Sequence, residues 1–87
     1  MAIKTFAAID VGSFELELGI YEISGKYGIR EIEQIRHPLA LGKDTYNDGR
    51  ISYGLVEEMC ELLNKFRQVM EMYRVTDYRA FASSALR

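Results

Sequence analysis

A run of apolar residues spaced three and four apart between positions 55 and 73 limits the possible folds of this chain more than any other feature. The apolar positions are Leu55, Val56, Met59, Leu62, Leu63, Phe66, Val69, Met70 and Tyr73. This spacing places them on one side of an α-helix, with charged residues on the other sides. Ser52 can cap a helix that begins at Tyr53 or Gly54. The pattern therefore predicts a helix of about 20 residues, roughly 30 Å long, with one face that packs against another element.

Two segments near the N-terminus have the patterns of β-strands. Residues 5–10 form a nearly continuous apolar run of strand length that ends in the carboxylate of Asp10, and Gly12 then favours a tight turn. The next residues alternate between apolar and polar or small side chains, which predicts a second strand with one buried face. Its apolar positions are Phe14, Leu16, Leu18 and Ile20. A cluster of turn residues at 24–28 then predicts a hairpin.

The third segment is ambiguous from its pattern alone. Ile29, Ile32 and Ile35 are three apart, which suits a helix. The hairpin turn before them favours a strand, and Pro38 would interrupt a helix. We therefore predict a strand that contains a β-bulge or a strong twist.

The final segment, residues 78–82, has the pattern of a short strand, so the predicted order of elements is β-β-β-α-β. A long helix between two strands favours a right-handed crossover and a parallel strand pair. The fold class is therefore α/β with a mixed sheet. One helix covers only one face of such a sheet, whereas parallel strands are normally covered on both faces. Because residues 83–87 also look like the start of a helix, we expect residues 1–87 to be a single incomplete domain.

Charge and cysteine content narrow the classes of function. The 11 basic and 13 acidic residues give a net charge of −2, which argues against a protein that coats nucleic acid but allows a local phosphate site. Cys60 is the only cysteine, and its place near the apolar side of the helix predicts a buried, inert thiol. No apolar run reaches the ~18 residues that cross a bilayer, and the first residues lack the layout of a secretion signal. We expect a cytoplasmic protein without nucleic-acid or membrane partners.

Two groups of polar residues follow the ends of predicted strands. After the first strand, Gly12 allows backbone to approach a phosphate, Ser13 adds a hydroxyl and an N–H, and Asp10 can hold Mg²⁺ through water. After the last strand, Ser83 and Arg87 can bind an anion beside the N–H groups of a helix start. Alternatively, Asp10 only bonds amides in a hairpin turn, and Arg87 is solvated at an ordinary helix start. If the two strands are parallel neighbours, both groups face one site.

Several ordered blocks of the sequence resemble one protein family. They are residues 6–13 (FAAIDVGS), 39–42 (LALG), 48–52 (DGRIS) and 80–87 (AFASSALR). Over essentially its whole length the chain resembles the N-terminal part of the exopolyphosphatase/guanosine pentaphosphate phosphohydrolase (Ppx/GppA) family. That family has a ribonuclease-H-like fold of the actin-like ATPase superfamily, so the resemblance implies that residues 1–87 begin its first lobe. It also implies hydrolysis of terminal phosphoanhydrides of inorganic polyphosphate or guanosine pentaphosphate by Mg²⁺-assisted attack of water.

The resemblance implies roles for individual residues. Asp10, Gly12 and Ser13 match the family's first phosphate-binding loop, with Asp10 on the metal side. Ser83 and Arg87 match residues on the phosphate side. The family's general-base Glu and its second phosphate-binding loop come later in its chains, so residues 1–87 alone are expected to be inactive.

The sequence departs from the family's pattern beside the first loop. Family members commonly continue the loop with Asn-Ser and then, one residue on, a basic or polar residue, whereas this chain has Phe14, Glu15 and Glu17. Two carboxylates beside a phosphate site repel an anion unless a cation intervenes. One alternative is therefore a catalytically degenerate protein that binds guanosine phosphates or another polyanion for regulation. Another is a structural role, in which the chain self-associates as a homo-oligomer through its uncovered sheet.

Overall fold

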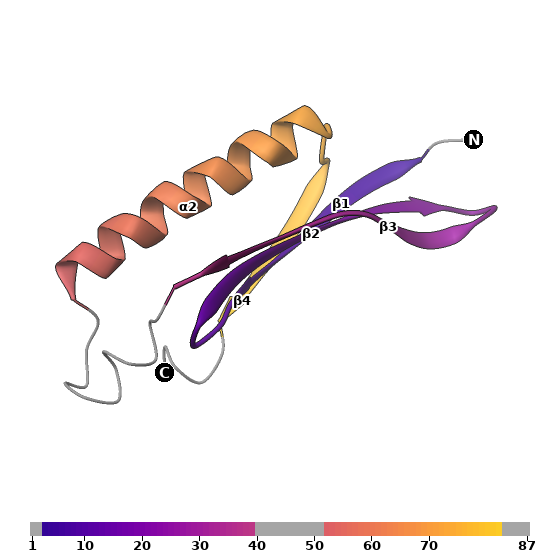
Figure 1. Cartoon of the computed structure of the whole chain (residues 1–87). Coiled ribbons are helices and arrows are strands. Elements are labelled where there is room, and N and C mark those ends of the chain that lie inside the picture. Colours follow the sequence, from indigo (N-terminus) through magenta and orange to yellow (C-terminus); the bar gives the residue numbers. More distant parts are fainter. Residues whose placement is uncertain (1–2, 40–51, 83–87) are drawn as a thin grey trace.

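The computed structural model describes residues 3–39 and 52–82. In chain order the elements are β1 (Lys4–Val11), β2 (Glu15–Ser24), β3 (Gly28–Pro38), α2 (Tyr53–Met72) and β4 (Asp77–Ala82). The strands form one sheet in the order β3-β2-β1-β4, in which β2 is antiparallel to both its neighbours and β4 is parallel to β1. Figure 1 shows α2 lying along one face of this sheet. The predicted α/β class, element order and mixed sheet are confirmed.

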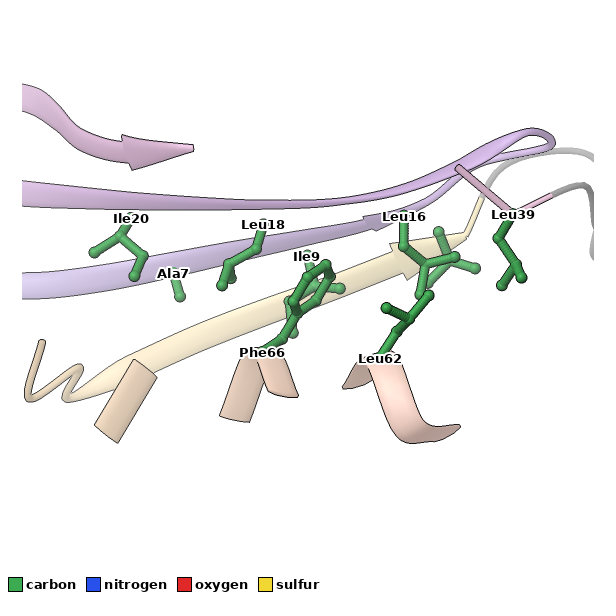
Figure 2. Close-up of a cluster of buried hydrophobic side chains, with 9 residues drawn as sticks. Ala7, Ile9, Leu16, Leu18, Ile20, Leu39, Leu62 and Phe66 are labelled. Atoms are coloured by element: carbon green, nitrogen blue, oxygen red, sulfur yellow. The ribbon is translucent and has the colours of Figure 1, made fainter. Parts of the chain in front are cut away.

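The core lies between α2 and the central strands β1 and β2. Side chains alternate between the two faces of a strand, so every second residue of β1 and β2 points toward the helix. From α2, Leu62 and Phe66 reach toward these residues (Figure 2). The buried apolar residues in the described part of the chain are Ala7, Ile9, Val11, Leu16, Leu18, Ile20, Leu39, Leu62 and Phe66.

Phe14 departs from the predicted alternation, because it is 61% exposed and lies in the turn before β2. The Gly12 N–H donates to the Glu15 carbonyl oxygen at 2.9 Å and closes this turn. The Phe14 carbonyl oxygen in turn accepts from the Leu39 N–H at 2.9 Å. Phe14 is therefore part of the turn, and the buried face of β2 begins at Leu16.

The predicted β-bulge is present in β3. Ile20 of β2 pairs with Glu33, but the next residue, Tyr21, pairs with Glu31, so Ile32 is the extra residue. A bulge shifts the alternation by one position. This shift lets Ile32 and Ile35 both pack against the core although they are three residues apart.

The N-terminus of α2 is the predicted one. Ser52 is the N-cap, and its hydroxyl oxygen accepts from the Leu55 N–H at 3.3 Å. Beyond the helix, Arg74 has a left-handed φ of 56°, a conformation that stops a helix from continuing. The prediction for Cys60 is wrong, because this residue is exposed. It lies two positions before Leu62, and residues two apart do not share a helix face.

The face of the sheet opposite α2 carries no covering element within residues 3–39 and 52–82. On this face Phe6, Ala8 and Asp10 of β1 are only half-buried, and every residue of the edge strand β4 is exposed. This agrees with the expectation that one helix covers one face. No helix in the described part of the chain is long and apolar enough to cross a membrane.

Candidate functional site

The candidate site lies at the end of the sheet where β1 and β4 both terminate. The two strands are parallel neighbours, and Val11 pairs with Ala82 at their carboxyl ends. The segment in which β1 ends and turns toward β2, here called the DVGS turn (residues 10–13), is therefore beside the end of β4. Carboxyl ends of neighbouring strands are where α/β sheets commonly bind ligands. Ser83 and Arg87, the other predicted site residues, follow β4 in the sequence and lie outside the described residues.

Glycine suits position 12 of the DVGS turn because the backbone is crowded there. A Cβ atom on Gly12 would lie 3.1 Å from the Glu15 carbonyl oxygen, which is closer than most such contacts. The same oxygen accepts the Gly12 N–H, so that donor is already used inside the turn. The hydrogen bonds among the described residues leave the Ser13 N–H and hydroxyl without a partner. Ser13 is therefore the better donor for an anion at this turn.

Asp10 belongs to a row of side chains that crosses the open face of the sheet. The register places Phe81 of β4 beside Asp10, Asp10 beside Glu17 of β2, and Glu17 beside Arg36 of β3. Directly paired residues on neighbouring strands have their side chains on the same face, about 5 Å apart. Two carboxylates, those of Asp10 and Glu17, are therefore neighbours next to the DVGS turn.

Glu17 is paired with residues on the side away from Asp10. Its Oε1 lies 3.4 Å from Nε of Arg36 and accepts a hydrogen bond from the Gln34 side-chain amide. Both partners are on β3, which flanks β2 on the side opposite β1. The fold thus provides a cation for the Glu17 carboxylate, which lies beside the predicted phosphate-binding turn.

Arg36 and Gln34 were missed by sequence reasoning because their position depends on the bulge. Continuing the pairing of Tyr21 with Glu31 without a bulge would place Ile35, not Arg36, opposite Glu17. The spacing of the three isoleucines was the available signal, since it required a bulge near Ile32.

Tyr21 lies on the same face, two rows further from the turn than Glu17, with Gly19 between them. Its ring folds over Gly19, where a Cβ atom would be 2.6 Å from the Tyr21 hydroxyl oxygen. Burial raises the pKa of Tyr21, and the negative charges of Glu31 and Glu17 raise it further. The β2–β3 side of the open face is therefore acidic around this hydroxyl.

The side chains at the turn are compatible with Mg²⁺ only if water and substrate oxygens supply most of the ligands. Within the described residues, no three His, Cys, Asp or Glu side chains cluster closely enough to hold a metal ion. Mg²⁺ commonly keeps several waters and binds one or two carboxylates together with the phosphates of a substrate. Asp10 fits that kind of site, in which water and substrate oxygens complete the coordination.

Comparison with known proteins places this geometry in a known fold. No protein-family model and no curated protein matches the chain. A solved Ppx/GppA family member from Aquifex aeolicus has a TM-score of 0.91 and 25% identity, over 98% of this chain and 28% of that one. An exopolyphosphatase from Cytophaga hutchinsonii has a TM-score of 0.87 and 23% identity, over 95% of this chain and 26% of that one.

The structural neighbours are thus Ppx/GppA proteins, which confirms the resemblance seen in the sequence. The mixed sheet with one helix matches the N-terminal lobe of their actin-like ATPase fold. The chain spans less than a third of the length of these structures.

Proposed function

We propose that the protein containing this chain is a Ppx/GppA-type phosphatase that hydrolyses terminal phosphoanhydrides of inorganic polyphosphate or guanosine pentaphosphate. The observation that carries the proposal is the parallel pairing of β1 with β4. This pairing puts the DVGS turn at the same end of the sheet as the carboxyl end of β4, the strand that leads into Ser83 and Arg87. The fold of the phosphatase family's N-terminal lobe supports the same assignment.

Each site residue has one role in this proposal. Gly12 keeps the turn tight, and Ser13 donates its N–H and hydroxyl to a phosphate oxygen. Ser83 and Arg87 donate to the same phosphate group, Arg87 with its planar guanidinium. Asp10 holds Mg²⁺ through water, and the ion neutralises charge on the phosphate when bound. A Glu outside residues 1–87 activates the attacking water, so these residues alone do not catalyse.

Phosphate release by the natural protein that contains this chain tests the proposal. We expect Mg²⁺-dependent release from polyphosphate or guanosine pentaphosphate, and we expect Asp10→Asn to lower the rate by about 100-fold, as for loss of one electrostatic group at a reacting centre. The matched control is Asp77→Asn, the same change on the same sheet face at the other end of β4. Equal rates for wild type and Asp10→Asn would contradict the role of Asp10. No release from either substrate would contradict the phosphatase.

A regulatory binding protein is the second candidate, and the exposed Phe14 side chain favours it. Phe14 and Glu15 stand where the family commonly has Asn-Ser, so the turn has lost an amide and a hydroxyl. A site with fewer donors can bind a guanosine phosphate without turning it over. Calorimetric titration of the same protein with guanosine pentaphosphate separates the candidates, because binding without phosphate release supports regulation and release contradicts it.

We also propose a cytoplasmic location. The thiol of Cys60 is free and exposed on α2. Such a thiol stays reduced in the cytoplasm but is prone to pairing or oxidation in an oxidising compartment. Recovery of the protein in the cytoplasmic fraction of fractionated cells would support this location, and recovery elsewhere would contradict it.

A further inference from the structure

We infer that Arg36 and Gln34 are positioning residues for the DVGS turn. They hold the Glu17 carboxylate on the β3 side of β2, so that Glu17 neither repels a bound phosphate nor competes with Asp10 for a cation. This inference rests on the proposed function of the turn and deepens it.

The contacts of Glu17 carry the inference. The register makes Asp10 and Arg36 its two nearest neighbours across the strands, one acidic and one basic. The contacts seen for the Glu17 carboxylate are on the basic side, with Nε of Arg36 at 3.4 Å and with the Gln34 amide. A carboxylate engaged by two donors on β3 is drawn away from β1, where Asp10 lies.

The negative charges around the turn make the pairing of Glu17 with Arg36 important for the binding of an anion. Asp10, Glu15 and Glu17 all lie at this end of the sheet, and Arg36 is the cation that pairs with one of them. Without Arg36, the Glu17 charge would be uncompensated beside Asp10, at the end of the sheet where we propose that phosphate binds. Charges that lie close together near a protein surface interact appreciably, and salt screens the interaction.

A second ion pair in the same sheet provides a matched control. Arg30 of β3 pairs with Glu22 of β2 at 2.7 Å, and these residues are also direct partners across the two strands. The pair has the same chemistry and comes from the same strands, but it lies toward the β2–β3 hairpin, away from the DVGS turn. Exposed ion pairs contribute little to stability, so removing either arginine should leave the fold intact.

The test measures binding of tripolyphosphate to the natural protein by calorimetry, in low salt with Mg²⁺. We expect Arg36→Gln to weaken binding about fivefold, the lower end of typical coupling between sites. Adding Glu17→Gln to that variant should restore binding to nearly the wild-type value, because the unpaired charge is removed. Arg30→Gln should bind as wild type does. The effect of Arg36→Gln should shrink as salt is added.

The outcomes separate this inference from the proposed function. If the wild type binds tripolyphosphate but the double variant stays as weak as Arg36→Gln, the positioning role is wrong, because Arg36 then acts directly or supports the fold. If the wild type does not bind, the proposed function of the turn falls and this inference with it. Thermal melting shows which variants are folded. Should Arg36→Gln unfold, Arg36→Lys, which keeps the charge, is expected to bind normally, and weakened binding would overturn the inference.

Discussion

At the residue scale, Tyr73 connects the end of α2 to β3 through a single hydrogen bond. Its hydroxyl donates to Oε2 of Glu33 at 3.0 Å. This hydrogen bond, followed by burial and the negative charge of Glu33, raises the pKa of Tyr73. The donating hydroxyl is the protonated form, so the fold favours the neutral tyrosine. Its contribution is fully present below the ordinary pKa of 10.0 and is lost as the pH rises through the higher folded pKa.

We therefore expect the free energy of unfolding to fall more steeply above about pH 10 in wild type than in Tyr73→Phe. Urea denaturation over a series of alkaline pH values measures this difference. Tyr53→Phe, which removes the hydroxyl of a 79% exposed tyrosine at the other end of α2, is the control for the substitution itself. Parallel curves for wild type and Tyr73→Phe would mean that the bond to Glu33 is not formed in solution.

Replacing either of two glycines by alanine is expected to change the free energy of unfolding, in opposite directions at the two positions. Gly12→Ala puts a Cβ atom 3.1 Å from a backbone oxygen of the turn, so we expect a loss of about 1 kcal/mol in the free energy of unfolding. Gly54→Ala meets nothing within 4 Å in α2, so we expect a gain of about 0.5 kcal/mol from helix propensity. Urea denaturation of both variants checks the pair, and equal effects would contradict the crowding at Gly12.

At the element scale, α2 holds one sheet face through few contacts. Leu62 and Phe66 are its buried residues, and both point at the buried side chains of β1 and β2 (Figure 2). Other apolar residues of the helix pack against the core without being fully buried, namely Leu55, Met59, Leu63, Val69 and Met70. The stability of the helix–sheet interface is therefore concentrated in the middle of the helix.

Truncation of one side chain of α2 tests whether the stability of the interface depends on the middle of the helix. We expect Phe66→Ala to lower the free energy of unfolding by about 3–5 kcal/mol, because the lost apolar contact leaves a cavity against the sheet. Met72→Ala is the control on the same helix, since Met72 is 78% exposed, and its change should stay within about 0.5 kcal/mol. A similar loss for both variants, measured by urea denaturation, would show that the core does not centre on Phe66.

At the scale of the whole molecule, the two edges of the sheet differ. β3 carries charged side chains, a bulge and Pro38, all of which hinder pairing with another strand. β4 carries two charged residues but no bulge and no proline, and its large side chains Tyr78 and Phe81 are exposed. An unprotected edge strand beside an uncovered sheet face is prone to pair with another chain.

We propose that residues 1–87, produced alone, self-associate as a homo-oligomer through β4. Sedimentation at increasing concentration measures this, and Phe81→Lys is expected to shift the chain toward monomer by placing a charge on the pairing strand. Tyr53→Lys makes the same kind of change at an exposed position of α2 and should leave association unaltered. A monomer at all concentrations would contradict the proposal.

Local patterns were sufficient to predict the elements and the turn between the first two strands. Periodicity and the Ser52 cap predicted α2, a short apolar run predicted β1, and period-two alternation predicted β2, because these signals depend on neighbours within a few residues. The same reasoning placed Asp10 at the end of β1, with Gly12 and Ser13 in the turn that follows. The roles of Ser83 and Arg87, and the single incomplete domain, stay predictions.

The tertiary structure alone decided which residues meet. The sheet order made β1 and β4 parallel neighbours, and the bulge at Ile32 shifted the β2–β3 register so that Arg36, not Ile35, faces Glu17. Strand pairing joins residues far apart in the chain, and one inserted residue moves every later side chain to the other face. Local sequence therefore specifies the elements and the turn, whereas strand pairing sets which charged side chains lie beside that turn.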